Sequence, residues 1–164
     1  MVAPETLNLE TDACNTGYGA HFGTRWFKGT WSVAQLARAW RKTRISMPYL
    51  EMHALVQAAL VWGLEWRGKR IEFRCDCQPT VHAVNTRYSG DSDQQHLLRT
   101  LTSHACLHGY DFRAIHIAGI TNTIADALSR DDLQKTGEKE PAVREWMRTM
   151  DLVATPEAAM PRHS

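Results

Sequence analysis

Residues 7–22 read LNLETDACNTGYGAHF and decide the fold. Leu7–Asp12 has the composition of a short strand, and the turn residues after it lead into a second strand at Gly17–Phe22. A third strand is predicted at Arg25–Trp31. Connections this short cannot carry a crossover, so the three strands are expected to pair antiparallel. Asp12 therefore ends the first strand of a meander.

Helices and strands alternate through the rest of the chain. The longest apolar-periodic stretch, Tyr49–Trp66, predicts a helix, and Pro48 suits its first turn because the missing N–H costs nothing there. Strands that alternate with helices predict parallel pairing, with helices on both faces of the sheet. The other expected elements are a short helix over Val33–Trp40, a basic linker over Arg41–Met47, a strand over Ile71–Asp76, helices over Gln78–Tyr88 and Gln94–His108, a strand over Tyr110–Ile117 and a helix over Thr121–Ser129.

Four carboxylates arrive at the tips of different elements: Asp12, Glu51, Asp76 and Asp126. Glu51 lies four residues before Leu55, on the apolar stripe of its helix, so it is expected to point inward rather than to be a solvated surface glutamate. If the fold gathers the four groups, each like-charged pair at about 4 Å repels by roughly 4 kcal/mol at an effective dielectric near 20. Such a cluster needs protonation or hard divalent cations, of which Mg²⁺ and Mn²⁺ suit oxygen ligands.

Composition narrows the class of protein. The 164 residues carry 19 Lys and Arg against 18 Asp and Glu, a net charge of +1, so contact with a nucleic acid has to come from locally placed cations. No run of 18 apolar residues predicts a membrane span, and no secretory leader pattern is seen at the start. We therefore expect an intracellular protein.

Four cysteines, Cys14, Cys75, Cys77 and Cys106, are expected to be reduced thiols, mostly buried. Cys75 and Cys77 flank Asp76. A zinc site built from these two thiols and His82 is the alternative, although C-x-C with one histidine lacks the usual spacing of four ligands.

The order of these acidic residues resembles a known family. Thr11-Asp12-Ala13 before a glycine turn, a glutamate on a helix, an aspartate ending a strand and the closing run Gly119–Asp126 resemble the D-E-D-D pattern of ribonuclease H. Ala125–Arg130 is similar to the ribonuclease H domains that follow reverse transcriptase in gypsy-type and DIRS-type retroelements, as are Gly29–Ser32 and Trp66–Arg70. The resemblance covers residues 7–131. It implies an α/β, ribonuclease H-like fold, with a mixed five-stranded sheet whose first three strands are antiparallel and with helices on both faces.

The resemblance also implies an activity, the hydrolysis of the RNA strand of an RNA–DNA hybrid with two divalent ions, Mg²⁺ or in its place Mn²⁺. Asp12 is the expected bridging ligand, Asp76 completes the shell of one ion, and Glu51 and Asp126 serve the second. Gln78, Asn122 and Asn15 match positions expected to contact the substrate, with helix capping as the other interpretation of Asn122. The hybrid and an attached reverse transcriptase are the expected partners.

Two features depart from the family pattern. Cellular enzymes carry a histidine on a longer loop before the final asparagine, whereas here only Ile120 and Thr121 separate Gly119 from Asn122. The basic protruding helix of some bacterial relatives is also missing, so an isolated domain is expected to hold a hybrid weakly. Two alternatives remain: a catalytically silent domain of this fold that tethers a reverse transcriptase, and a DNA-cutting nuclease.

The domain is expected to span residues 4–131. Residues 132–164 are interpreted as a polar linker over Gln134–Pro141, a short amphipathic helix over Ala142–Met150 and a disordered end. A monomer is expected for the isolated chain.

Overall fold

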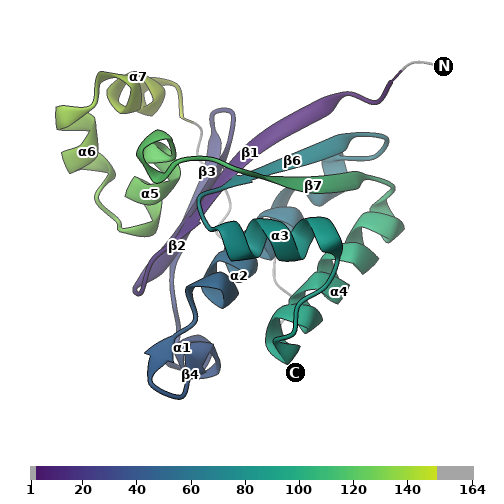
Figure 1. The fold of residues 1–164 in the computed structure, drawn as a ribbon. Coiled ribbons are helices and arrows are strands. Elements are labelled where there is room, and N and C mark those ends of the chain that lie inside the picture. The colour runs from purple at the N-terminus through teal and green to yellow at the C-terminus, as the bar shows by residue number, and fades with distance from the viewer. Residues whose placement is uncertain (1–2, 151–164) are drawn as a thin grey trace.

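A mixed five-stranded sheet in the order β3-β2-β1-β6-β7 forms the centre of the molecule (Figure 1). The computed structural model describes residues 3–150. β1, β2 and β3 pair antiparallel, while β1, β6 and β7 pair parallel, as predicted. The strands are β1 (Thr6–Ala13), β2 (Gly17–Phe22), β3 (Arg25–Thr30), β6 (Arg70–Cys75) and β7 (Asp111–His116).

The register of β1 and β6 places the two strand-end aspartates beside each other. In this parallel pair Glu10 lies opposite Arg74. Two residues further along, each strand reaches its aspartate, Asp12 in β1 and Asp76 just beyond β6. Because parallel strands end at the same edge of a sheet, both carboxylates lie at one edge.

The two faces of β2 explain how helices cover both sides of the sheet. Tyr18 and Ala20 are buried toward the face covered by α2 (Met47–Trp62). On the other face, a Cβ atom at Gly19 would lie 2.3 Å from the Cβ of Leu128, so only glycine allows α5 (Thr123–Ser129) to approach this closely. Figure 1 shows α5 on one side of the sheet and α2 on the other. Helices therefore cover both faces, as predicted.

Apolar packing against the sheet fixes α2. The predicted inward stripe is buried, with Leu55, Ala58, Ala59 and Trp62 each at most 3% exposed. Ser46 caps the helix by accepting a hydrogen bond from the Tyr49 N–H at 3.2 Å, and Pro48 lies in the first turn as expected. A stiff, capped helix start is a suitable support for Glu51, one turn further on.

The remaining helices complete the layers, and none in residues 3–150 is long and apolar enough to cross a membrane. α3 and α4 lie on the same side of the sheet as α2, while α6 and α7 lie beside α5 (Figure 1). The further elements are α1 (Val33–Ala39), β4 (Trp40–Arg41), β5 (Arg44–Ile45), the 3₁₀ turns η1 (Gly63–Glu65) and η2 (Gly119–Thr121), α3 (Gln78–Thr86), α4 (Ser92–His108), α6 (Leu133–Lys139) and α7 (Pro141–Thr149).

Two segments expected to be linkers have regular structure. Trp40–Ile45 forms a small hairpin of β4 and β5, in which Lys42 adopts a left-handed backbone at φ 57°. Leu133–Lys139 forms α6, where a polar linker was predicted from residue 134 onward. Its polar sequence is held by packing against α7, which begins within a residue of the predicted position. The predicted disordered end lies outside the described residues.

Candidate metal centre

All four predicted carboxylates line one pocket at the edge of the sheet. Its volume is about 300 Å³. Four different elements supply the acids: β1, α2, the end of β6 and α5. The lining residues are Asp12, Ala13, Met47, Glu51, Asp76, Cys77, Asp126 and Arg130. The fold thus gathers acidic side chains that are separated by up to 114 positions in the sequence.

Asp12 is buried and lies close to other acidic groups. Its side chain is 3% exposed, and its Oδ2 accepts a hydrogen bond from the Ser129 hydroxyl at 2.9 Å. Burial, with the neighbouring charges of Asp76 and Asp126, raises the pKa of Asp12 from 3.8 to about 8. The serine hydrogen bond acts in the opposite direction but does not offset burial. Without a cation, the pocket therefore favours a protonated Asp12 near neutral pH.

Both carboxylate oxygens of Glu51 have a partner in the protein. Its Oε1 accepts a hydrogen bond from the backbone N–H of Ala13 at 3.1 Å, and its Oε2 lies 3.7 Å from the Cys75 thiol sulfur. The side chain is 3% exposed, which confirms that it points inward. Burial, followed by the charges of Asp12 and Asp76, raises the pKa of Glu51 well above its ordinary value.

Asp126 and Asp76 lie nearer the surface of the pocket. The Asp126 Oδ1 accepts a hydrogen bond from Nε of Arg130 at 2.9 Å, one turn along α5, and the Asp126 side chain is 44% exposed. A Cβ atom at Gly119 would lie 3.2 Å from Oδ2 of Asp76, so the glycine leaves room above this carboxylate. These two acids remain accessible to an ion or a substrate.

The three expected substrate residues do not line the pocket. Asn15 and Gln78 are exposed, the first in the β1–β2 turn and the second at the start of α3. Asn122 is fully buried, and its Nδ2 donates to the Thr11 carbonyl oxygen at 3.0 Å. Asn122 occupies the N-cap position of α5, as the capping interpretation expected, but its side chain makes no cap hydrogen bond to that helix. Asn122 instead ties α5 to the strand that carries Asp12.

Ser129 and Arg130 contact the acidic groups, and sequence reasoning assigned neither a role. Both belong to the run Ala125–Arg130 that resembles retroelement domains. The available signal was helical spacing, since Arg130 follows Asp126 by four residues and such pairs face each other. The contact of Ser129 with Asp12 joins residues 117 positions apart, which no local pattern reveals.

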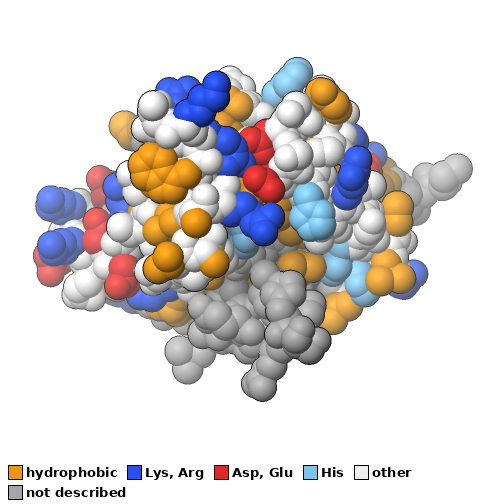
Figure 2. All heavy atoms as spheres, turned by 90° about the horizontal axis from the view of Figure 1, so that it is seen from below, with side chains coloured by type: hydrophobic (Ala, Val, Ile, Leu, Met, Phe, Trp, Pro, Cys, Tyr) orange, Lys and Arg blue, Asp and Glu red, His pale blue; other side chains and the backbone are white. Residues whose placement is uncertain are grey.

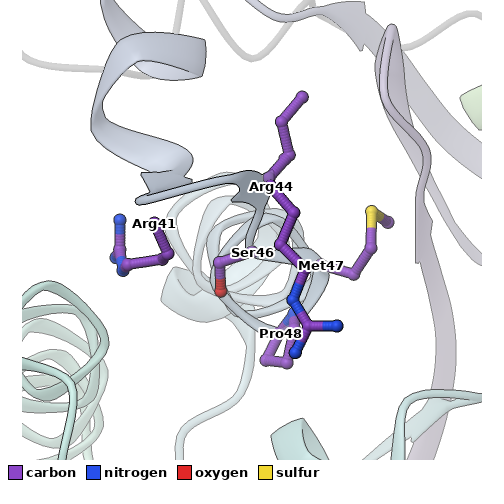
Figure 3. Close-up of a pocket in the computed structure, with 6 residues that line it drawn as sticks. Arg41, Arg44, Ser46, Met47 and Pro48 are labelled. Carbon is purple, nitrogen blue, oxygen red and sulfur yellow. The ribbon is translucent and has the colours of Figure 1, made fainter.

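A basic pocket adjoins the acidic one. Its volume is about 420 Å³, and Met47 lines both pockets. Arg41 and Arg44 come from β4 and β5, while Ser46, Met47 and Pro48 come from the start of α2 (Figure 3). Because α2 also carries Glu51, the cations and the acids lie on neighbouring parts of one surface.

The two arginines of this pocket differ in their partners. Arg41 donates to both carboxylate oxygens of Asp91, at 2.6 and 3.0 Å, and also contacts Asp93. Among the described residues, no ion pair engages Arg44, whose side chain is exposed. Figure 2, which views the molecule from the side of α1 and α4, shows acidic side chains set between basic ones. Arg41 is therefore neutralised within the fold, and Arg44 is available to a ligand.

Several solved structures similar to this chain are ribonucleases H. No protein-family model and no curated protein sequence matches the chain. RNase H1 from the halophilic archaeon Halobacterium salinarum is 18% identical, with a TM-score of 0.59 over 79% of this chain and 98% of that chain. The chain has the ribonuclease H fold.

Two further structures with the ribonuclease H fold agree. The N-terminal RNase H domain of a Mycobacterium tuberculosis protein is 15% identical, with a TM-score of 0.52 over 82% of this chain and 98% of that chain. LC11-RNase H1, in complex with an RNA/DNA hybrid, is 14% identical, with a TM-score of 0.52 over 79% of this chain and 97% of that chain. At these identities the likeness establishes the fold.

The donor set of the acidic pocket fits divalent cations. Four carboxylates converge, and Arg130, the single cation among the described residues that line the pocket, contacts the partly exposed Asp126. The raised pKa of Asp12 shows that the protein alone does not balance this charge. Hard oxygen ligands in excess over local cations are the donors that Mg²⁺ and Mn²⁺ prefer.

Proposed function

We propose that the protein is a divalent-metal-dependent ribonuclease H that hydrolyses the RNA strand of RNA–DNA hybrids. The convergence of Asp12, Glu51, Asp76 and Asp126 on one pocket carries this proposal. The D-E-D-D order of the sequence and the ribonuclease H fold support it. So does the hybrid bound to LC11-RNase H1, a protein of the same fold.

The four carboxylates would hold two Mg²⁺ ions, for which Mn²⁺ would substitute, with Asp12 as the shared ligand. Asp76 would complete one set of ligands, and Glu51 and Asp126 the other. Such ions activate a water for attack on phosphorus and stabilise the departing ribose oxygen. The protein contributes fixed ligand positions, since the Ala13 N–H orients Glu51 and the Ser129 hydroxyl orients Asp12.

The basic pocket supplies a place for the substrate backbone. Arg44 is exposed and unpaired among the described residues, and Met47 joins its pocket to the acidic one. A guanidinium binds phosphate oxygens through parallel N–H groups. We assign Arg44 to a backbone phosphate of the hybrid, and Gln78 and Asn15 to weaker contacts at the rim. Asn122 supports the site from beneath.

We further propose that the domain works beside a reverse transcriptase of a retroelement. The runs Gly29–Ser32, Trp66–Arg70 and Ala125–Arg130 support this context. α3 and α4 follow each other with only five residues between them, which leaves no room for a basic helix. The cation in that connection, Arg87, is already engaged, since it donates to the Phe112 carbonyl oxygen at 2.7 Å and stacks on the Phe112 ring. An attached polymerase would supply the additional contacts that bind the hybrid.

Cleavage of labelled nucleic acids tests the activity. The protein should cut the RNA of an RNA–DNA hybrid with Mg²⁺ or Mn²⁺, leave RNA and DNA duplexes intact, and lose activity with a chelator. Asp12→Asn should lower the rate by more than about 100-fold, because even the loss of a second-shell partner of a metal costs 10- to 100-fold. Asp111→Asn is the matched control. Asp111 is an exposed aspartate at the first residue of β7, and the acidic pocket lies at the other edge of the sheet, where the parallel strands end.

Two outcomes would contradict the proposal. Stabilisation of the fold by Mg²⁺ without any cleavage, with a polymerase partner present, would indicate a silent tethering domain. Cleavage of duplex DNA in preference to the hybrid would indicate a DNA nuclease that uses the same acidic pocket.

A further inference from the structure

Three sulfur-containing residues lie at or next to the acidic pocket. Cys77 and Met47 line it, and Cys75, which is fully buried, contacts the lining residue Glu51. The Cys75 sulfur lies 3.7 Å from Oε2 of Glu51. Mg²⁺ binds oxygen and has little affinity for sulfur, so these thiols add nothing to a magnesium site. They would change which other cations the pocket accepts.

The geometry of the thiol and the carboxylates suits a thiophilic ion. One ligand atom each from Glu51, Cys75 and Asp76 lies within 4.8 Å of the others. In a tetrahedral zinc site, with metal–oxygen bonds of about 2.1 Å and metal–sulfur bonds of about 2.3 Å, oxygen and sulfur lie about 3.6 Å apart. The Glu51–Cys75 pair already has this separation. Asp76 is only partly buried just beyond the end of β6, so a bound ion would draw its carboxylate closer.

We propose that Glu51, Cys75 and Asp76 form a binding site for a thiophilic divalent cation such as Zn²⁺ or Cd²⁺. The Cys75 thiol gives up its proton to the solvent when the ion binds, as metal-bound cysteines do. This site differs from the zinc site considered from sequence, because His82 is exposed and does not line the pocket. Carboxylates take the place of the expected histidine.

Occupation of this site would inhibit the nuclease, a consequence that rests on the proposed function. Glu51 and Asp76 are also the proposed ligands of Mg²⁺, so one pair of carboxylates cannot serve both cations at once. A soft ligand such as a thiolate favours Zn²⁺ over Mg²⁺ at equal concentration. The pocket would therefore be blocked by low zinc and released by chelation or by a large excess of magnesium.

Cadmium binding tests the site without reference to catalysis. Cd²⁺ is titrated into the reduced full-length Cys106→Ser protein, and the thiolate-to-cadmium charge-transfer absorbance is measured. The substitution removes the exposed thiol on α4 that would bind cadmium on its own. A second change, Cys75→Ser, should weaken binding by about 10- to 100-fold, the range seen even for lost second-shell partners. Cys14→Ser is the matched control, since that buried thiol bonds the Ser129 carbonyl oxygen and Thr16 instead.

A band of equal strength and affinity in the Cys75→Ser protein would overturn the proposal. Should that variant fail to fold by circular dichroism, Asp76→Asn serves instead, because it keeps every thiol and alters a partly exposed side chain. Unchanged Cd²⁺ affinity in Asp76→Asn would equally overturn the site, whereas weaker binding supports it.

Zinc inhibition tests the consequence. The Zn²⁺ concentration that halves hybrid cleavage in Mg²⁺ should rise about 10- to 100-fold in Cys75→Ser, with each protein compared with its own zinc-free rate. Equal zinc sensitivity would overturn the inhibitory role. A protein that cleaves no hybrid but shows the Cys75-dependent cadmium band would contradict the nuclease proposal while supporting the cation site.

Discussion

Asp12 is a buried carboxyl group whose nearest charged neighbours are also acidic. Its pKa of about 8 arises from burial first and from Asp76 second. An unfolded aspartate ionises near 3.8, so the metal-free fold holds a proton that the unfolded chain releases. Between these two pH values the folded protein binds more protons, and its free energy of unfolding falls as the pH rises.

Metal-free protein should accordingly be less stable at pH 8 than at about pH 5, with a slope of up to about 1.4 kcal/mol per pH unit from Asp12. Urea unfolding in the presence of a chelator measures this slope. Mg²⁺ should restore stability at the higher pH, because it binds the ionised carboxylates of the folded state alone. Asp12→Asn should flatten the slope without removing it, since the pKa of Glu51 is also raised. Stability that increases toward pH 8 without metal would contradict this account.

The sequence indicates the position of some site residues but not the contacts of others. The acids were found because each follows a strand or begins a helix, and the ends of parallel strands meet at one edge. The contact of Ser129 with Asp12 and that of Cys75 with Glu51 depend on how separate elements pack. Asn122 was expected to contact the substrate or to cap a helix, and its hydrogen bond to Thr11 could not be read from helix-start patterns.

At the scale of elements, the pairing directions of the strands were predictable from the short connections and the alternation with helices, and the long helix α2 from its apolar periodicity. The hairpin of β4 and β5 was not, since its six residues contain four cations or polar groups and lack a strand pattern. Tertiary ion pairs stabilise it: Arg41 contacts Asp91 and Asp93, and Arg38 contacts Asp93, all at the start of α4. The interactions that form this hairpin lie 50 or more residues away.

The two arginines of the hairpin are predicted to have different roles, Arg44 in substrate binding and Arg41 in stability. Arg44→Ala should raise the KM for the hybrid, with little change in kcat or in the free energy of unfolding. The slope of log binding constant against log salt concentration should become shallower by about 1, the value for one lost phosphate contact. Arg41→Ala should instead lower the free energy of unfolding, because it leaves the partly buried Asp91 without its ion-pair partner. Steady-state kinetics at several salt concentrations and urea unfolding measure the two effects. Equal behaviour of the two variants would contradict the assignment of Arg44 to substrate.

For the whole molecule, two helices lie beyond the predicted boundary at residue 131, and both contact the rest of the fold. α7 buries Val143, and Nε1 of Trp146 donates to the Gly23 carbonyl oxygen at 2.8 Å in the turn between β2 and β3. The Trp146 ring also meets the His21 ring edge to face. α6 packs against both α5 and α7, so the last two helices brace the element that carries Asp126. We propose that they belong to the domain.

Trp146→Ala should therefore destabilise the whole domain by about 2 kcal/mol, from lost apolar burial and one lost hydrogen bond. Trp40→Ala is the matched control, because Trp40 is 52% exposed on the β4 strand and its loss should change stability by about 0.5 kcal/mol or less. Urea unfolding should show a single transition for each protein, shifted for Trp146→Ala alone. If α6 and α7 were an independent appendage, Trp146→Ala would leave the main transition unchanged. The same variant should also weaken the Mg²⁺-dependent stabilisation, because α5 holds Asp126 against the pocket only while its outer side is supported.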